Sequence, residues 1–241
     1  NYEWWGTYDP PANQNDYNGL PSIYPTRLET PDLKWEPATT LDGGIEFGFL
    51  NDRITGEITA YTKTTRDVIL QLTVPRNLGF ETYFDNVGEI LNRGIEFSIK
   101  SLNTVGKFKW TTEFNIANNY NEIVSIGDYS EDAVSGGTND TRVVVGSPVG
   151  TSFLVRFSHV DPANGRPVYL DINGNETYEW NPNDRVPVGD VLPDVVGGLT
   201  NRFQFKNWDM SFLLYYSFGG KADDSSSKRQ LGVVTDWNMR T

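Results

Sequence analysis

The chain has no cysteine and only one histidine, His159, among its 241 residues. Without thiols it forms no disulfide bond, no thiolate metal site and no thiol nucleophile. One histidine is too few for a histidine-rich metal centre, and no Gly-x-Ser-x-Gly motif supplies a serine nucleophile beside it. Carboxylates are plentiful, but no spacing rule selects two of them for glycoside hydrolysis. The sequence therefore predicts that the chain is not an enzyme and has no cofactor.

Positive charge and long apolar runs are also scarce. The chain has 20 Lys and Arg residues against 32 Asp and Glu residues, a net charge of −12, so it lacks the clustered cations that nucleic-acid binding needs. No run of about 18 apolar residues is present, which argues against a transmembrane helix, and no signal-like apolar segment begins the sequence. Membrane-crossing strands stay possible, because each needs only about ten residues of alternating polarity.

What the chain does contain favours strands. Aromatic residues make up 13% of the sequence, and 23 glycines and 13 prolines are spread along it. Aromatic side chains are enriched in strands, whereas glycine and proline end regular elements and form turns. No stretch has the convincing spacing of a helix. The composition therefore predicts an all-β chain of strands joined by long polar loops.

One hairpin, residues 89–118, organises the chain. Its arms, 94–100 and 108–116, alternate apolar and polar side chains with a period of two, as strands with two unlike faces do. A short polar turn at 103–107 separates them. The predicted apolar side consists of Ile95, Phe97, Ile99, Phe108, Trp110, Phe114 and Ile116, and the polar side includes Glu96, Lys100 and Glu113.

Two more hairpins have the same design. Residues 39–63 fold back at an Asn-Asp turn, with Glu46 and Glu57 on the polar side, and residues 199–218 fold back at a Lys-Asn turn. The other segments lack this alternation. We therefore predict a loop over 1–36, a long connection over 66–88 with one short strand near 68–74, and an excursion over 121–193 with short strands at 151–157 and 167–171.

The lengths of the connections predict the architecture. Long and short connections alternate along the chain, and in an antiparallel up-and-down sheet alternate connections lie at the same end. All tight turns then fall on one side and all long loops on the other, which is the layout of an outer-membrane β-barrel with long extracellular loops. Its apolar sides face lipid, and its lumen-facing residues are predicted to be Glu46, Glu57, Glu96, Lys100 and Glu113. One alternative stays open: a soluble β-sandwich, secreted or at the cell surface, that binds carbohydrate.

Aromatic residues in the loops are the candidate ligand-binding residues. Trp4 and Trp5 belong to an aromatic group near the beginning of the chain, and Tyr178 and Trp180 lie in the longest irregular segment. Aromatic rings stack on the apolar faces of sugars while nearby amides and carboxylates bind hydroxyl groups. Packing beneath a loop is the alternative role for each of these rings.

A weaker candidate is a metal site at Asp171, Asn173 and Asn175. Oxygen ligands at alternate positions suit a calcium ion. However, Glu176 occupies the place where an EF-hand loop needs glycine, and Pro182 occupies the place of its last glutamate. The alternative is a plain Asn-Gly turn between two short strands.

A set of short motifs recurs in order along the chain. They are Pro-Asp-Leu-Lys-Trp-Glu at 31–36, Gly-Ile-Glu-Phe-Gly-Phe-Leu-Asn-Asp-Arg-Ile-Thr-Gly at 44–56, Asn-Arg-Gly-Ile-Glu at 92–96, the strand at 110–119, Gly-Ser-Pro-Val-Gly at 146–150, Gly-Arg-Pro-Val-Tyr at 165–169, Gly-Gly-Leu-Thr-Asn at 197–201 and Ser-Phe-Gly-Gly at 217–220. Together they resemble the carboxy-terminal part of the β-barrel of SusC-like (SusC/RagA) TonB-dependent outer-membrane transporters. The resemblance covers about residues 24–221.

The resemblance implies import of a nutrient, such as an oligosaccharide or a peptide, across the outer membrane of a Gram-negative bacterium of the Bacteroidetes type. It also implies a 22-stranded barrel around an amino-terminal plug, energy supplied through TonB, a SusD-like surface lipoprotein as partner, and outer-membrane lipid around the wall. Neither a plug nor enough strands to close such a barrel occurs in the sequence. We therefore expect residues 1–241 to be a partial β-barrel domain, with 121–193 as an extracellular loop excursion within it.

Overall fold

The computed structural model describes residues 5–9, 24–74, 82–135 and 141–221. Apart from one 3-10 turn, Pro182–Asp184, the regular structure in these ranges is entirely strand. No helix within them is long and apolar enough to cross a membrane. The prediction of an all-β antiparallel chain is confirmed.

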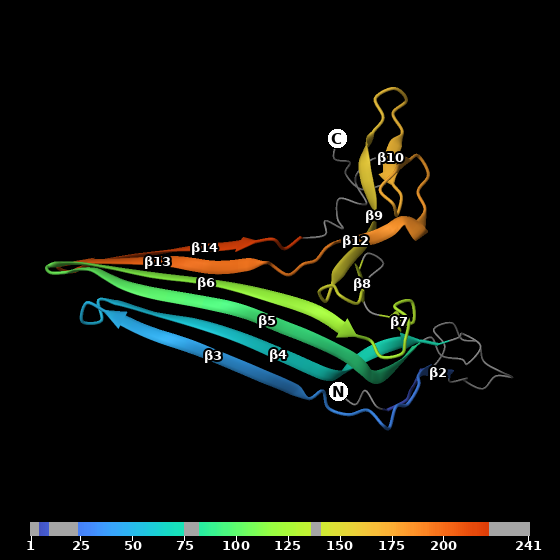
Figure 1. The fold of residues 1–241 in the computed structure, drawn as a ribbon, viewed down its shortest axis with the longest axis horizontal. Coiled ribbons are helices and arrows are strands. Elements are labelled where there is room, and N and C mark those ends of the chain that lie inside the picture. Colours follow the sequence, from blue (N-terminus) through green and yellow to red (C-terminus); the bar gives the residue numbers. More distant parts are fainter. Residues whose placement is uncertain (1–4, 10–23, 75–81, 136–140, 222–241) are drawn as a thin grey trace.

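Most of the chain forms one seven-stranded antiparallel sheet, which runs along the length of Figure 1. Its long strands follow each other in the order β14-β13-β6-β5-β4-β3, and the short strand β7 pairs with β4. The bounds are β3 Ala38–Phe49, β4 Ile54–Thr73, β5 Thr82–Val105, β6 Phe108–Ser125, β7 Val134–Ser135, β13 Val195–Phe205 and β14 Trp208–Phe218.

A second, five-stranded sheet stands at one end of the first (Figure 1). Its order is β11-β10-β9-β12, with β8 beside β9. Its strands come from the predicted excursion, where β9 and β10 confirm the short strands expected at 151–157 and 167–171. The bounds are β8 Thr141–Arg142, β9 Thr151–Val160, β10 Pro167–Leu170, β11 Glu176–Thr177 and β12 Arg185–Gly189.

All three tight turns of the long sheet lie at the end away from the second sheet (Figure 1). They join β3 to β4, β5 to β6 and β13 to β14. In the first turn Leu50, Asn51 and Asp52 have positive φ angles of 57°, 57° and 59°. Asn and Asp enter this left-handed region more readily than most residues. The predicted separation of tight turns from long connections is confirmed.

The register gives the long sheet one apolar and one polar face. Residues directly opposite each other in neighbouring strands point to the same side, and Ile58 pairs with both Ile45 and Phe97. One position away, Glu46 pairs with Glu57. The same alternation continues through β6, β13 and β14, as the sequence predicts.

No described element covers the apolar face of the long sheet. Its side chains stay exposed, including Ile45 at 71%, Trp208 at 81% and Leu214 at 57%. A β-sandwich buries such a face under a second sheet, but the second sheet here stands at the end of the first and not over it (Figure 1). The sandwich alternative is therefore wrong for the described residues.

A small conventional core lies at the end of the long sheet opposite the tight turns. Leu72, Ile123, Ile126 and Val134 are buried together there. The side chains packed against this cluster come from the outer parts of β4 and β5 and from the segment after β8. The long strands therefore leave the exposed apolar band and continue into a compact, protein-covered end.

Strands β4 and β5 are longer than predicted. The sequence predicted a long connection over 66–88 with one short strand near 68–74. That strand is present as the outer part of β4, which continues to Thr73, but β5 already begins at Thr82. The pairing register shifts between Thr65 and Val68, and Asp67 between them takes a left-handed φ of 51°. Such a β-bulge inserts an extra residue into one strand. The period of two therefore breaks although the strand continues.

The prediction of an unbroken loop over 1–36 is also wrong. A short antiparallel pair, β1 Thr7–Asp9 and β2 Tyr24–Arg27, lies within it. These segments are too short for alternation to identify them, because three or four residues do not define a period.

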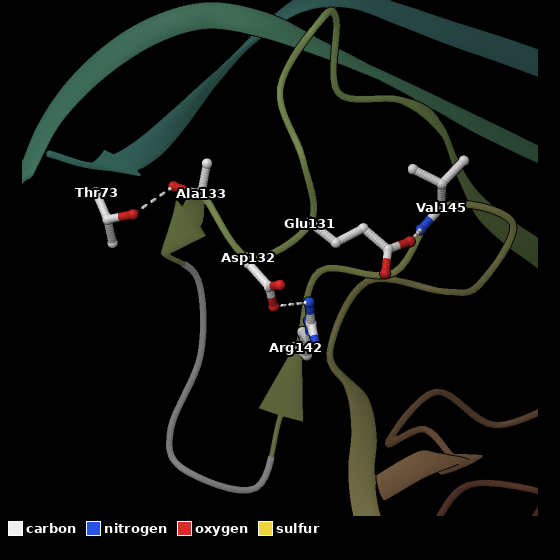
Figure 2. Close-up of polar contacts among 6 residues, drawn as sticks. All are labelled: Thr73, Glu131, Asp132, Ala133, Arg142 and Val145. Carbon is white, nitrogen blue, oxygen red and sulfur yellow. Dashed lines mark hydrogen bonds and ion pairs between the residues drawn. The ribbon is translucent and has the colours of Figure 1, made fainter. Parts of the chain in front are cut away.

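Polar contacts tie the segment after β6 to both sheets (Figure 2). The backbone N–H and the hydroxyl of Thr73 donate to the carbonyl of Ala133 at 2.7 and 3.0 Å. Next to this contact, Asp132 forms an ion pair with Arg142 of β8. Since β7 pairs with β4 and β8 pairs with β9, this segment links the end of the long sheet to the second sheet.

Some glycines of the long sheet lie beneath aromatic rings of the neighbouring strand. Gly94 pairs directly with Tyr61, and Gly197 pairs directly with Tyr216. A Cβ atom on Gly197 meets both the Tyr216 ring and the backbone oxygen of Asn115. The Tyr216 hydroxyl donates to that same oxygen at 2.9 Å. Such aromatic and glycine pairs help to fix the register of neighbouring strands.

We predict that Gly197→Ala destabilises the sheet by about 1–3 kcal/mol, the usual cost of overpacking. The added methyl group has no space, because backbone and ring atoms occupy its position. Gly43→Ala is the matched control, since a Cβ atom there meets nothing within 4 Å. The measurement is the free energy of unfolding of the complete protein in detergent micelles. Equal stability of the two variants would contradict the prediction.

Candidate functional site: the polar face and the outer loops

The polar face of the long sheet collects the charged residues that the sequence predicts for the lumen. Glu46 and Glu57 pair across β3 and β4, and Lys100 and Glu113 pair across β5 and β6. Glu96 of β5 alternates onto the same side. The register thus brings all five side chains onto one face.

Glu113 lies between two cations. Its Oε1 is 3.4 Å from Nζ of Lys100, and its Oε2 is 3.5 Å from Nη2 of Arg202 on β13. All three side chains are partly exposed, so each pair contributes only ~0.2–1 kcal/mol. Sequence analysis did not single out Arg202. Its place on the polar side of 199–205 is visible in the alternation, but its partner is known only once β13 is seen to lie beside β6.

Glu46 and Glu57 carry negative charge without such compensation. They lie directly opposite each other, and no Lys or Arg of the described ranges comes within 4 Å of either carboxylate. Glu57 accepts one hydrogen bond, from the hydroxyl of Thr59 at 2.9 Å. Like charges on facing strand positions repel each other. Both side chains line an open hollow of about 620 Å³, which Lys100 and Glu113 also border.

A second hollow, of about 480 Å³, lies beside the first on the same face, and Glu57 borders both. Tyr215 and Leu213 of β14 line it, with 70% and 63% of their surface exposed. Glu96 lines it as well. An aromatic ring next to carboxylates provides both a stacking surface and hydrogen-bond acceptors for a polar ligand. Sequence analysis did not name Tyr215 as a candidate.

In the second sheet, Tyr178 is held by its neighbours. Its hydroxyl donates to Oδ2 of Asp161 at 2.6 Å, and the guanidinium of Arg166 lies 4.8 Å from the centre of its ring. Asp161 also accepts the backbone N–H of Ala163 at 2.8 Å and the side-chain amide of Asn164. These contacts hold the ring of Tyr178 in place, although 44% of the residue stays exposed, and its role in ligand binding stays a prediction. Asp161 was not recognised from the sequence, because its partner lies 17 residues away.

Trp180 presents more of its ring to solvent. It is 54% exposed. The guanidinium of Arg185 lies over its ring, 5.9 Å from the ring centre. Trp5, before β1, is also 54% exposed. Trp4 lies outside the described residues. Of the four predicted aromatic residues, Trp180 is thus the one with an open ring face in the second sheet.

Asp171 closes a tight turn between β10 and β11. Its Oδ1 accepts the backbone N–H groups of Asn173 and Asn175, both at 2.8 Å, and its Oδ2 accepts the side-chain amide of Asn175 at 3.0 Å. These bonds hold the pKa of Asp171 below its ordinary value. The geometry is that of the Asn-Gly turn considered as an alternative. The described residues contain no group of three or more His, Cys, Asp and Glu side chains arranged for a metal, and calcium binding stays a prediction.

Residues 4–222 match the family model described as a TonB-dependent receptor-like β-barrel. The chain is 38% identical over 222 residues to the TonB-dependent receptor SusC of Bacteroides thetaiotaomicron, covering 81% of this chain and 22% of that protein. It is 32% identical over 205 residues to the TonB-dependent receptor P26 of Formosa agariphila, covering 77% of this chain and 20% of that protein. The chain therefore spans only about a fifth of the length of these relatives.

Solved structures show the same fold. The RagAB peptide transporter matches 91% of this chain, with a TM-score of 0.77 and 20% sequence identity, over 25% of its own chain. The closed-closed state of the RagAB peptide importer matches 91% of this chain, with a TM-score of 0.76 and 21% identity, also over 25% of its own chain. The long sheet and its second sheet thus have counterparts in a much larger molecule.

We predict that the loop around Asp161 loosens in acid. Hydrogen bonds from the Tyr178 hydroxyl, from the backbone N–H of Ala163 and from the Asn164 amide hold the pKa of Asp161 below its ordinary value of 3.8. Because the folded pKa is lowered, this stabilisation is complete above the ordinary pKa and is lost as the pH falls through the lowered one. Amide hydrogen exchange of residues 161–178, corrected for intrinsic rates, measures the effect.

The control for this prediction is Asp161→Asn. The amide does not titrate, so the variant should exchange faster than the parent at neutral pH and show no further loss of protection from this turn in acid. Equal protection of these amides in the parent at about pH 6 and about pH 2 would contradict the prediction.

Proposed function

The chain belongs to the TonB-dependent receptor β-barrel family, and from this membership we propose that it forms part of the wall of a SusC/RagA-type transporter that imports a nutrient such as an oligosaccharide or a peptide. The observation that carries the proposal is the long sheet with one exposed apolar face and one polar face. TonB-dependent receptor β-barrels are outer-membrane proteins of Gram-negative bacteria. In such a barrel the apolar face meets lipid and the polar face meets the lumen.

The arrangement of the two ends supports an orientation in the membrane. Outer-membrane barrels have short periplasmic turns and long extracellular loops. The tight turn at 50–53 then lies on the periplasmic side, and the second sheet, built from 141–189, lies outside the cell. The carboxylates of Glu46, Glu57 and Glu96 line the lumen wall between them.

The proposed partners follow from the relatives. The RagAB structures are described as a peptide transporter and a peptide importer, and the resemblance to SusC-like transporters implies a SusD-like lipoprotein as partner. We propose a SusD-like surface lipoprotein beside the outer loops of this chain, and TonB acting through parts of the protein outside it. The family transports and binds rather than catalyses, so the proposed function includes no reaction.

A matched pair of substitutions on β4 tests which face meets lipid. Ile58 lies on the apolar face and Thr59, next to it, on the polar face. An arginine facing lipid near the middle of a barrel wall costs about 2–4 kcal/mol. We predict that Ile58→Arg lowers the free energy of unfolding of the complete protein by about this amount, whereas Thr59→Arg, which comes close to Glu57 and Glu96, changes it by less than about 1 kcal/mol.

The readout is the folded fraction of the complete protein in detergent and in the outer-membrane fraction. Equal tolerance of the two arginines would argue against a lipid-facing apolar side. A complete protein that stays folded and monodisperse in buffer without detergent would overturn the transporter proposal itself.

Trp180 is the proposed ligand contact of the outer loops, supported by its open ring. We predict that Trp180→Ala weakens binding of the transported oligosaccharide or peptide by about two- to tenfold, the range expected for one stacking ring. Tyr178→Phe is the matched control, because it keeps a ring nearby and removes only the hydroxyl that bonds Asp161. Affinities are measured on the complete protein across a panel of both ligand classes. Unchanged affinity of Trp180→Ala for every ligand that binds the parent would remove this role.

A further inference from the structure

The apolar face carries a groove that the proposed transport function does not use. Two neighbouring rows of residues cross the strands here. Each row consists of direct cross-strand partners, which point to the same side. The two rows are two residues apart along each strand, so both point to the same face of the sheet. The outer row is Leu41, Thr62, Arg93 and Tyr120, and the inner row is Gly43, Ala60, Ile95 and Asn118. Together they line an open hollow of about 960 Å³.

Small residues make the hollow. Gly43 has no side chain, and a Cβ atom placed there meets nothing within 4 Å. Ala60 pairs with it on the next strand. Leu41 and Ile95 stand beside them, 72% and 58% exposed, and form apolar walls. The floor and walls suit a hydrocarbon chain, because the face around the groove is apolar and no described element covers it.

One cation stands at the outer end of this groove. The guanidinium of Arg93 lies 4.6 Å from the centre of the Tyr120 ring. Arg93 is exposed, and no carboxylate of the described residues lies within 4 Å of it. By register the nearest acidic residue on the same face is Glu122, which pairs with Leu91 one row further out; Glu89, a further row out, is paired with Arg66. The five N–H donors of Arg93 are thus available to an anion, and phosphate matches their fork geometry.

The height of Arg93 on the wall corresponds to the level of lipid headgroups. From the inner turn after Val105 to Arg93 the strand β5 advances about 12 residues, which is roughly 40 Å along the strand and roughly 30 Å along the barrel axis at a tilt of about 40°. The apolar band of a barrel is about 25 Å tall, and aromatic girdles mark its edges. Inward from Arg93 the same side of β5 carries Ile95, Phe97 and Ile99, which belong to the band.

From this juxtaposition we propose that the groove binds one molecule of a phosphate-bearing lipid of the surrounding membrane, with an acyl chain over Gly43 and Ala60 and its phosphate on Arg93 beside Tyr120. The inference rests on the proposed function, since it needs the apolar face to meet lipid. The occupant is a lipid rather than free phosphate, because the groove continues from the cation into an apolar hollow. Charge complementarity fixes its headgroup as anionic.

Native mass spectrometry of the complete protein in detergent tests the proposal with three probes: dioleoyl phosphatidic acid, dioleoylglycerol and inorganic phosphate. The parent should retain phosphatidic acid in preference to the other two. Arg93→Gln should weaken retention of phosphatidic acid by about tenfold, as expected for loss of a charge-assisted hydrogen bond. Retention by Arg93→Lys should lie between that of the parent and that of Arg93→Gln. Glu122→Gln, which removes the nearby negative charge, should strengthen it.

The groove is tested separately from the cation. Gly43→Leu places a side chain into the open hollow and should weaken retention of phosphatidic acid while leaving Arg93 in place, and Gly43→Ala should have a smaller effect. Lys206→Gln is the control, because it removes a cation from the opposite, inner end of the sheet. Each variant is first shown to be folded by its resistance to unfolding in detergent.

Equal retention of phosphatidic acid by the parent and Arg93→Gln would overturn the inference, and so would equal loss in Lys206→Gln. Binding of inorganic phosphate as strong as that of the lipid would also overturn it, since the hollow would then contribute nothing. These failures are distinct from failure of the transporter proposal, which shows as independence from detergent or as tolerance of Ile58→Arg.

Discussion

The uncovered apolar face of the long sheet is the constraint on which the rest of the structure depends. Each square ångström of such surface costs about 25 cal/mol in water, and here Ile45, Trp208 and Leu214 lie open over the length of the sheet. Inside the sheet the backbone groups are paired from β3 to β14, so hydrocarbon around it leaves few of them unsatisfied. In a membrane barrel, the hydrocarbon of the lipid surrounds this face. The same face in water is an aggregation hazard, and this explains why the sheet belongs to a closed wall.

Where the strands leave that band, the chain uses a different means of burial. Beyond the bulge at Asp67, β4 and β5 continue to an end at which Leu72, Ile123 and Val134 form a small core under protein rather than lipid. The hydrogen bond from the Thr73 hydroxyl to the carbonyl of Ala133 and the ion pair between Asp132 and Arg142 of β8 join this end to the second sheet (Figure 2). β4, β5 and β6 therefore run from the exposed apolar band into a protein-covered core, and the sequence changes from strict alternation to mixed burial between the two.

The sequence predicts the structure well where the strands alternate strictly and poorly beyond that part. Alternation with a period of two is imposed by the difference between lipid and lumen, and it correctly gave the three long hairpins, their tight turns and the shared face of Glu46, Glu57, Glu96, Lys100 and Glu113. It failed at 66–88, where a bulge shifts the period, and at 1–36, where the strands are too short to show one. Contacts such as Arg202 with Glu113, Tyr178 with Asp161 and Arg93 with Tyr120 were not predicted, because each depends on a strand pairing or a side-chain orientation that alternation alone does not give.

The polar face, finally, limits what can lie against it. Two carboxylates about 4 Å apart repel by about 1 kcal/mol in bulk water but by about 4 kcal/mol at the effective dielectric constant of a protein surface. Glu46 and Glu57 are direct cross-strand partners without a cation of the described residues within 4 Å, whereas Glu113 has two. A dry environment would make the first pair costly, whereas Glu113 would keep its two cations. The face at β3 and β4 therefore requires water or a positively charged group against it, and the compensation of charge on the polar face is local to Glu113.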